Sequence, residues 1–267
     1  MIKREKFGIP QNTDPIKDAK IVEALLGADV AKKYEAAFGT KSSTDTSYEP
    51  TQDEVEKVRQ ERNKAKEAEK NIAESKRLML AWANESGIED EYIEKHVEYL
   101  PNGDIIWNGF CDFSNNKKVT SFPPRLKEVN GALKISGTNI ESLSDCPLSV
   151  TQLYCSDTNI KSLKGCPVSV KSIFCSHTGI KNLVGCPSSV NNIICSNTPI
   201  SSLEGCPLSV TFVEIIDCYD LLEVPEGLNM GLYFRVNSSQ TELILNILDK
   251  GYDYDLDNFD DQDHEDY

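Results

Sequence analysis

The apolar and polar positions of the chain are most regular in its middle. From residue 131 to residue 210, one 20-residue pattern occurs four times with no insertion or deletion between the copies. Each copy presents Val, then Leu or Ile, then Cys or Ile, and finally Ile, Leu and Cys before a proline. A fixed period of this length predicts a solenoid, in which each copy forms one coil.

Positions that keep their chemistry in every copy are expected to face the interior. They include four columns: Val150, Val170, Val190 and Val210; Ile140, Ile160, Ile180 and Ile200; Leu143, Leu163, Leu183 and Leu203; and Cys146, Cys166, Cys186 and Cys206. One copy reads V-x-x-L-x-C-x-x-T-x-I-x-x-L-x-x-C-P, which resembles the leucine-rich repeat, with Thr where that family usually has Asn. We expect the Thr hydroxyl to satisfy loop backbone, which is a structural role.

A single copy cannot fold alone. Its six or so apolar side chains contribute on the order of 9 to 18 kcal/mol when buried. Ordering twenty residues of backbone costs roughly 20 to 40 kcal/mol. The copies must therefore stack and bury one another's flanks. The predicted fold is α+β: a short leucine-rich-repeat solenoid with a parallel β-sheet on its concave face, an N-terminal helical region and a C-terminal capping helix.

Helical patterns precede the repeats. Residues 1–50 are expected to be semi-ordered with short helices, one starting near Asp14 and Pro15. Residues 51–90 are expected to form a long charged helix, opened by a capping box of Thr51 and Glu54. Its thin apolar stripe fits a solvated helix, and its heptad-like spacing also leaves open a coiled coil or a helix that docks on a partner.

Both ends of the solenoid are predicted to be capped. Residues 91–130 are expected to hold an N-terminal cap with a hairpin and a first irregular repeat, and residues 131–230 the leucine-rich repeats. A strand and a helix over 231–251, with a capping box of Ser239 and Glu242, should close the other end. Residues 252–267 contain eight acidic residues and are expected to form a disordered acidic tail.

The charge of the chain limits its partners. It has 43 acidic and 28 basic residues and a net charge of -15, which argues against direct contact with nucleic acid or an anionic membrane. No apolar run reaches the length of a membrane span. The first residues, MIKREKFGIPQN, lack the apolar core of a signal peptide, so we expect a cytoplasmic product.

Nine cysteines invite a metal or redox interpretation. Their spacing follows the repeat and includes no C-x-x-C pair, so we expect seven of them to form two interior ladders of packed thiols. Strand spacing alone does not forbid disulfides, but the odd count and the missing signal peptide favour reduced thiols. Cys175 and His177 resemble a thiolate and its base, yet Asp157 and Asn197 replace His177 in other copies. We therefore predict no catalytic residue, no metal and no cofactor.

Residues that vary between copies while flanking the interior strand positions should line the concave face. The middle of these runs is apolar over three adjacent coils and covers roughly 300 to 500 Å², large enough to indicate a binding surface. The predicted partner-binding residues are Lys134, Gln152, Tyr154, Phe174, Asn192, Ile194, Phe212, Glu214 and Ile216. The alternative is that the N-terminal helix or a second copy of the chain covers this patch.

The wording P-x-S-V-x-x-L-x-C-S-x-T-x-I-x-x-L-x-G-C-P is similar to the short repeats of secreted bacterial effectors and of tailed-bacteriophage proteins. The phage likeness extends over the preceding segment from Leu100 to Leu143, so that it covers residues 97 to 230. It implies a non-enzymatic scaffold in the host cytoplasm or the virion. Such a scaffold would bind a viral structural or host protein and use its N-terminal helices for docking or self-association. The alternative is an acidic inhibitor that imitates nucleic acid or occupies a basic host surface.

Overall fold

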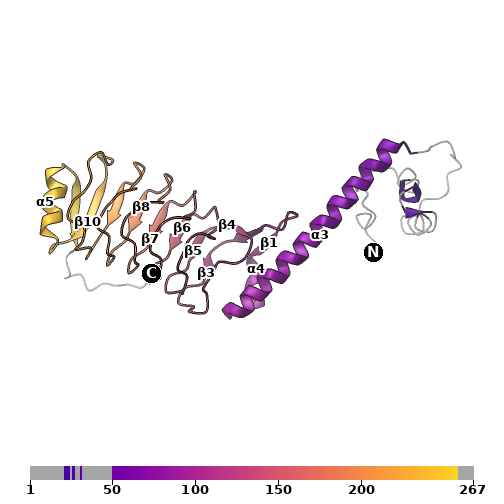
Figure 1. Ribbon diagram of the computed structural model, residues 1–267, viewed down its shortest axis with the longest axis horizontal. Coiled ribbons are helices and arrows are strands. Elements are labelled where there is room, and N and C mark those ends of the chain that lie inside the picture. The colour runs from indigo at the N-terminus through magenta and orange to yellow at the C-terminus, as the bar shows by residue number, and fades with distance from the viewer. Residues whose placement is uncertain (1–20, 25, 28–30, 32–49, 258–267) are drawn as a thin grey trace. The chain divides into compact units, whose positions relative to one another are not determined.

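The computed structural model describes residues 21–24, 26, 27, 31 and 50–257 (Figure 1). The chain divides into two compact units, one of residues 1–74 with 101–103 and the other of residues 75–100 with 104–267. In the first unit, residues 21–24 and 26 are helical, and Gly27 follows with a left-handed φ of 88°. Most of the remaining expectations for residues 1–50 lie outside the described residues.

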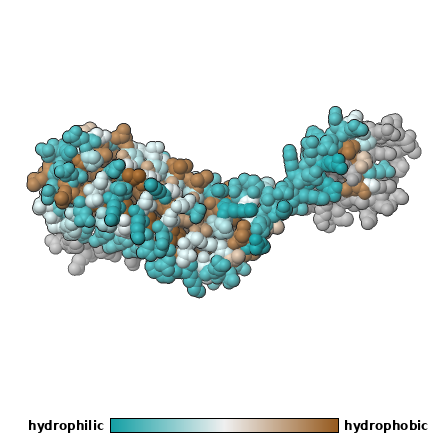
Figure 2. Space-filling model, viewed as in Figure 1, coloured by the Kyte–Doolittle hydropathy of each residue, from teal (hydrophilic) through white to brown (hydrophobic). Residues whose placement is uncertain are grey.

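Helix α3 (Gln52–Ser86) is long and polar. The capping box is confirmed, since the Glu54 N–H donates to Thr51 Oγ1 at 3.3 Å and the Thr51 N–H donates to Glu54 Oε2 at 2.9 Å. Hydrophilic residues cover its visible face (Figure 2). None of the helices in the described part of the chain is long and apolar enough to cross a membrane.

The C-terminal end of α3 packs on the first coil of the solenoid. Met79 and Trp82 are buried there. The Trp82 ring meets Phe113 edge-on at 5.2 Å between centroids, and its Nε1–H donates to the carbonyl of Ser121 at 3.1 Å. This end of the helix therefore belongs to the cap that closes the hydrophobic interior.

The solenoid is built on one parallel sheet of eight strands, in the order β11-β10-β9-β8-β7-β6-β5-β3 (Figure 1). Its strands are β3 (Cys111–Asp112), β5 (Ala132–Lys134), β6 (Gln152–Tyr154), β7 (Ser172–Phe174), β8 (Asn192–Ile194), β9 (Phe212–Glu214), β10 (Tyr233–Asn237) and β11 (Asp253–Asp257). The register keeps the copies in phase, because Leu153 pairs with Leu133 on one side and with Ile173 on the other. The leucine-rich-repeat solenoid predicted from the repeat is confirmed.

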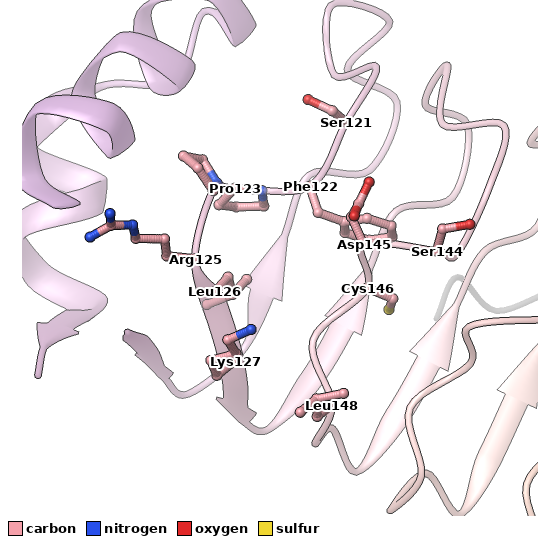
Figure 3. A pocket seen from close by; sticks show the side chains of 11 residues that line it. Ser121, Phe122, Pro123, Arg125, Leu126, Lys127, Ser144, Asp145, Cys146 and Leu148 are labelled. Carbon is pink, nitrogen blue, oxygen red and sulfur yellow. The ribbon is translucent and has the colours of Figure 1, made fainter. Parts of the chain in front are cut away.

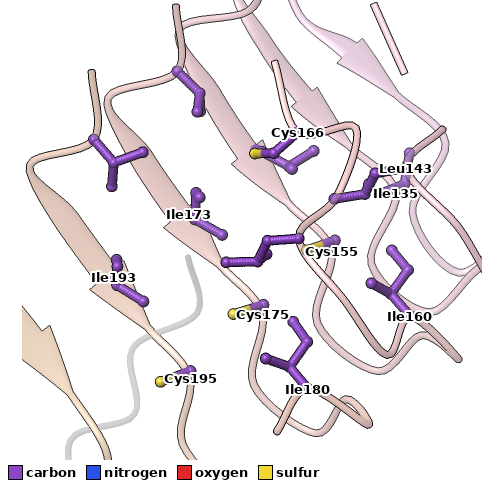
Figure 4. Close-up of a cluster of buried hydrophobic side chains, with 14 of the residues drawn as sticks. Ile135, Leu143, Cys155, Ile160, Cys166, Ile173, Cys175, Ile180, Ile193 and Cys195 are labelled. Carbon is purple, nitrogen blue, oxygen red and sulfur yellow. The ribbon is translucent and has the colours of Figure 1, made fainter. Parts of the chain in front are cut away.

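The interior is a continuous column of stacked side chains. Figure 4 shows Cys155, Cys175 and Cys195 following one another from coil to coil. All three are fully buried, as are Ile173 and Ile193 on the same strands. The predicted interior positions of the repeat are therefore correct. Cys186 and Cys206 of the second ladder differ from the others in being only partly buried.

After each of β6, β7 and β8 the chain turns through a left-handed residue. The φ angles of Asp157, His177 and Asn197 lie between 55° and 56°. Their backbone N–H groups donate to the next coil, as His177 does to the carbonyl of Ser196 at 3.0 Å. The expected role of the threonines is confirmed, because the hydroxyl of Thr178 donates to the carbonyl of Cys175 at 2.7 Å inside this turn.

A glycine column sets how closely the coils stack on the opposite side. At Gly165, Gly185 and Gly205 an added Cβ would lie 2.4 to 2.7 Å from backbone of the preceding coil, and all three have positive φ. The first copy has Asp145 in this column. The coil before Asp145 is the irregular one, where the stacking is looser.

The N-terminal cap contains the expected hairpin. Helix α4 (Asp90–His96) leads into β1 (Val97–Tyr99), which pairs antiparallel with β2 (Ile105–Asn108). Strand β4 (Leu126–Asn130) joins them in a separate three-stranded sheet. Phe113, Val119, Phe122 and Val129 of the irregular repeat are buried.

Two expectations for the C-terminal end are wrong. Helix α5 (Thr241–Asp249) has Gln240 at its N-cap with no side-chain capping bond, because the Ser239 hydroxyl donates instead to Asn237 Oδ1 at 2.8 Å. Residues 253–257, assigned to the disordered tail, form β11 and pair parallel with β10. Tyr254 and Leu256 pack against the core. The free energy gained by this packing offsets the cost of placing the aspartates that alternate with them in a strand. Residues 258–267 lie outside the described part of the chain.

Candidate binding surface on the outward face of the sheet

The outward face of the sheet carries columns of residues that the register aligns. The middle column consists of Asp112, Lys134, Tyr154, Phe174, Ile194, Glu214, Arg235 and Asp255. The first column consists of Ala132, Gln152, Ser172, Asn192, Phe212, Tyr233 and Asp253. We call these two columns, together with the residues Ser156, Ser176, Ser196 and Ile216 that follow the strands, the concave face.

Aromatic side chains form the centre of the concave face. The rings of Tyr154 and Phe174 stack with centroids 4.2 Å apart and an interplanar angle of 3°. Lys134 Nζ lies 5.4 Å from the Tyr154 centroid, within the range of a cation–π contact. Ile194 continues the apolar run, and all four side chains are half-buried. This strip is held rigidly by its neighbours, so binding would cost little side-chain entropy.

The C-terminal end of the face is charged. Arg235 Nη2 lies 2.9 Å from Asp257 Oδ1, and Arg235 Nη1 lies 3.5 Å from Glu214 Oε2. The hydroxyl of Ser196 also donates to Glu214 Oε1 at 3.1 Å. These contacts connect Ser196, which follows β8, with residues of β9 to β11 across the face, and they engage both oxygens of the Glu214 carboxylate.

The structure places all nine predicted binding residues on this face, each of them half-buried. Three further residues that the alternation assigned to the face, Ala132, Ser172 and Ser196, are buried. Ser172 is covered because Asn192 Nδ2 donates to its hydroxyl at 3.3 Å.

Five residues of the face were missed from the sequence: Asp112, Tyr233, Arg235, Asp253 and Asp255. Tyr233 stacks on Phe212 with centroids 6.3 Å apart. Their alternation with interior Phe234 and Tyr254 was the signal that could have found them.

Cys175 and His177 do not form a catalytic pair. Cys175 is fully buried, whereas His177 is exposed, because the left-handed turn directs its side chain away from the interior. Burial raises the pKa of the Cys175 thiol well above its ordinary value. It also raises the pKa of Cys166 to about 12 and that of Cys206 to about 11, so these thiols stay protonated at neutral pH. Among the described residues, no group of three or more His, Cys, Asp or Glu side chains is placed to hold a metal ion.

A pocket of about 390 Å³ lies where the irregular coil, with the first residues of β4, meets the first regular coil. The turn with Ser144 and Asp145 lies beside the segment from Ser121 to Pro123 (Figure 3). The lining of the pocket mixes Pro, Leu and Phe with a few charged side chains.

Two solved structures are similar to part of the chain. YopM from Yersinia enterocolitica WA-314 is 23% identical over 44% of this chain and 29% of that chain, with a TM-score of 0.37. The functional domain of InlJ from Listeria monocytogenes, described as including a cysteine ladder, is 18% identical over 50% of this chain and 33% of that chain, with a TM-score of 0.34. The chain thus spans about a third of the length of each structure. No protein-family model matches the sequence, and no curated protein is significantly similar to it.

Proposed function

We propose that the chain is a non-enzymatic scaffold that binds a protein partner through the concave face. One observation carries the proposal: the stacked rings of Tyr154 and Phe174 stay half-exposed in a column that the solenoid leaves free to vary. The interior columns account for stability, so these rings are not needed to hold the coils together. Rigid, partly exposed aromatic side chains are typical of binding hot spots.

The finer proposal concerns the setting of the scaffold. Its N-terminal helices would dock it onto a larger assembly, and the partner would be a viral structural protein or a host protein. The similarity of the repeat sequence pattern to that of tailed-phage proteins supports this setting. The polar length of α3 and the packing of its C-terminal end on the first coil are consistent with a helix that carries the solenoid.

Capture of partners from extracts of the infected host tests the concave face. The variant is Tyr154→Lys with Phe174→Lys. Its matched control is Leu148→Lys with Leu208→Lys, which changes two apolar side chains that are 61% and 69% exposed on turns before the strands. A partner bound by the wild type and by the control, but lost from the concave-face variant, supports the proposal. Equal capture by the two variants, with thermal unfolding unchanged in both, contradicts it.

A further inference from the structure

We propose that the partner segment is an amphipathic α-helix that lies across the strands, with a basic N-terminal end over β9 to β11 and its C-terminal end over Lys134. This inference rests on the proposed function, because it concerns the occupant of the same concave face. It follows from the spacing of the coils, from the hydrogen bonds that already pair the backbone of the sheet, and from the uneven charge of the face.

The spacing of the apolar side chains fits a helix better than an extended peptide. Tyr154, Phe174 and Ile194 lie on adjacent parallel strands, which are about 4.8 Å apart. Side chains on one face of an α-helix recur about every 5.4 Å, so three of them follow three coils with little drift. Alternate side chains of an extended chain are about 6.6 Å apart and lose register after one coil.

The sheet offers side chains rather than backbone to this segment. Each of β5 to β10 is paired on both sides, so its N–H and C=O groups are used within the sheet. Strand addition is therefore excluded on the face itself. Half-buried polar groups flank the apolar strip on both sides, with Gln152 and Asn192 on one side and Ser156 and Ser176 on the other. A helix with an apolar stripe and polar flanks complements this cross-section.

The charge along the face gives the helix a direction. At one end of the face, Lys134 pairs in the register with Asp112, which is exposed, so the two charges offset each other there. At the other end, Arg235 is already paired with Glu214 and Asp257. Asp253 and Asp255 are exposed and have no ion-pair partner within residues 50–257. The uncompensated charge of the face is therefore negative and lies over β11.

A helix responds to this field through its side chains and its dipole. The N-terminus of a helix carries roughly half a positive charge, so it prefers the carboxylates of β11, which leaves the C-terminal end over Lys134. From Lys134 to Asp255 the face crosses six strand intervals, about 29 Å. This length corresponds to a helix of about 19 residues. Basic residues in its first turns would add contacts with Asp253 and Asp255.

The direct test is selection from a displayed library of random peptides of about 20 residues, panned on the full-length chain. Peptides retained by the wild type but not by the Tyr154→Lys, Phe174→Lys variant are sequenced. We expect apolar residues at intervals of three and four and an excess of Lys and Arg in the N-terminal third. Concave-face-dependent peptides with a period of two, or with basic residues at the C-terminal end, overturn this inference and leave the proposed function standing. If no selected peptide depends on Tyr154 and Phe174, both fall.

A charge change then tests the direction. Asp253→Asn with Asp255→Asn should weaken the selected peptide roughly fivefold at low salt, and the difference should shrink at high salt. The matched control is Glu223→Gln with Glu226→Gln, which removes the same charge from exposed turn residues outside the strands and should leave the affinity unchanged. An equal loss in both variants means that only the net charge of the chain is felt, and it contradicts the proposed orientation.

Discussion

Replacing Gly185 by Ala tests how closely the coils stack. Its φ is +97°, and a Cβ would lie 2.7 Å from the Lys164 nitrogen and 2.8 Å from the Leu163 carbonyl carbon. A left-handed conformation costs a residue with a Cβ about 1 to 2 kcal/mol. Forcing the backbone of the preceding coil aside adds about 1 to 3 kcal/mol, as overpacking does elsewhere. The free energy of unfolding should therefore fall by about 2 to 5 kcal/mol.

Two matched variants separate these contributions. Gly227 has a φ of +78° and nothing within 4 Å of its Cβ position, so Gly227→Ala should show only the conformational cost of about 1 to 2 kcal/mol. Asp145 occupies the same column as Gly185 but already carries a side chain, so Asp145→Ala should stay within about 0.5 kcal/mol of the wild type. Urea unfolding followed by circular dichroism measures all three. A loss at Gly185 no greater than the loss at Gly227 would refute the reasoning about close stacking.

Three further predictions concern the interior and outward side chains of strand β7, the buried thiol of Cys175, and residues 258–267. Ile173→Ala should lower the free energy of unfolding by about 2 to 5 kcal/mol, whereas Phe174→Ala, on the outward face of the same strand, should cost clearly less in the same urea titration. Because burial raises the pKa of Cys175 above its ordinary value near 9, the folded thiol stays neutral while the unfolded thiol ionises as pH rises. Stability should therefore fall above about pH 9 by up to about 1.4 kcal/mol per pH unit and thiol, and Cys175→Val should reduce this slope in urea titrations over that range. Deleting residues 258–267 should leave partner capture and its salt dependence unchanged, whereas a sharp loss would favour the acidic-inhibitor alternative. A deletion from residue 252 would not test this point, because it removes β11.

The repeat predicted the fold well because four aligned copies separate structural from free positions within one sequence. Val150, Leu153 and Cys155 belong to columns that keep their chemistry between copies, and all three are buried, as those columns predict. The same comparison argued against a catalytic pair of Cys175 and His177, because the other copies have Asp and Asn at the position of His177. Where a feature occurs only once in the chain, no second copy is available to separate its structural positions from its variable ones.

The C-terminal end shows this limit. The acidic composition after residue 252 predicts a disordered tail, whereas the alternation of Tyr254 and Leu256 with aspartates is typical of a strand. The structure follows the alternation. Ser239 has the right spacing for a capping box, but its N–H and its hydroxyl both donate to Asn237 Oδ1, two residues earlier in the chain. Two local contacts compete for the same side chain, and residue spacing alone does not decide between them.

The candidate site was predictable as a set of columns but not in its details. Alternation places Tyr154 and Phe174 outward, and their near-parallel stacking follows from the shared register. Alternation cannot predict that Asn192 covers Ser172, nor that Arg235 links carboxylates of two strands. These depend on side-chain conformations across neighbouring coils.

Site-specific photo-crosslinking measures most directly whether the concave face recognises a partner. A photoreactive phenylalanine analogue is placed at Phe174, on the face, or at Leu208, which is exposed on a turn outside the strands. The full-length chain is then irradiated in a cell extract. We predict one discrete protein adduct from position 174 and none from position 208. Adducts from position 208 alone, or equal adducts from both positions, would contradict the account.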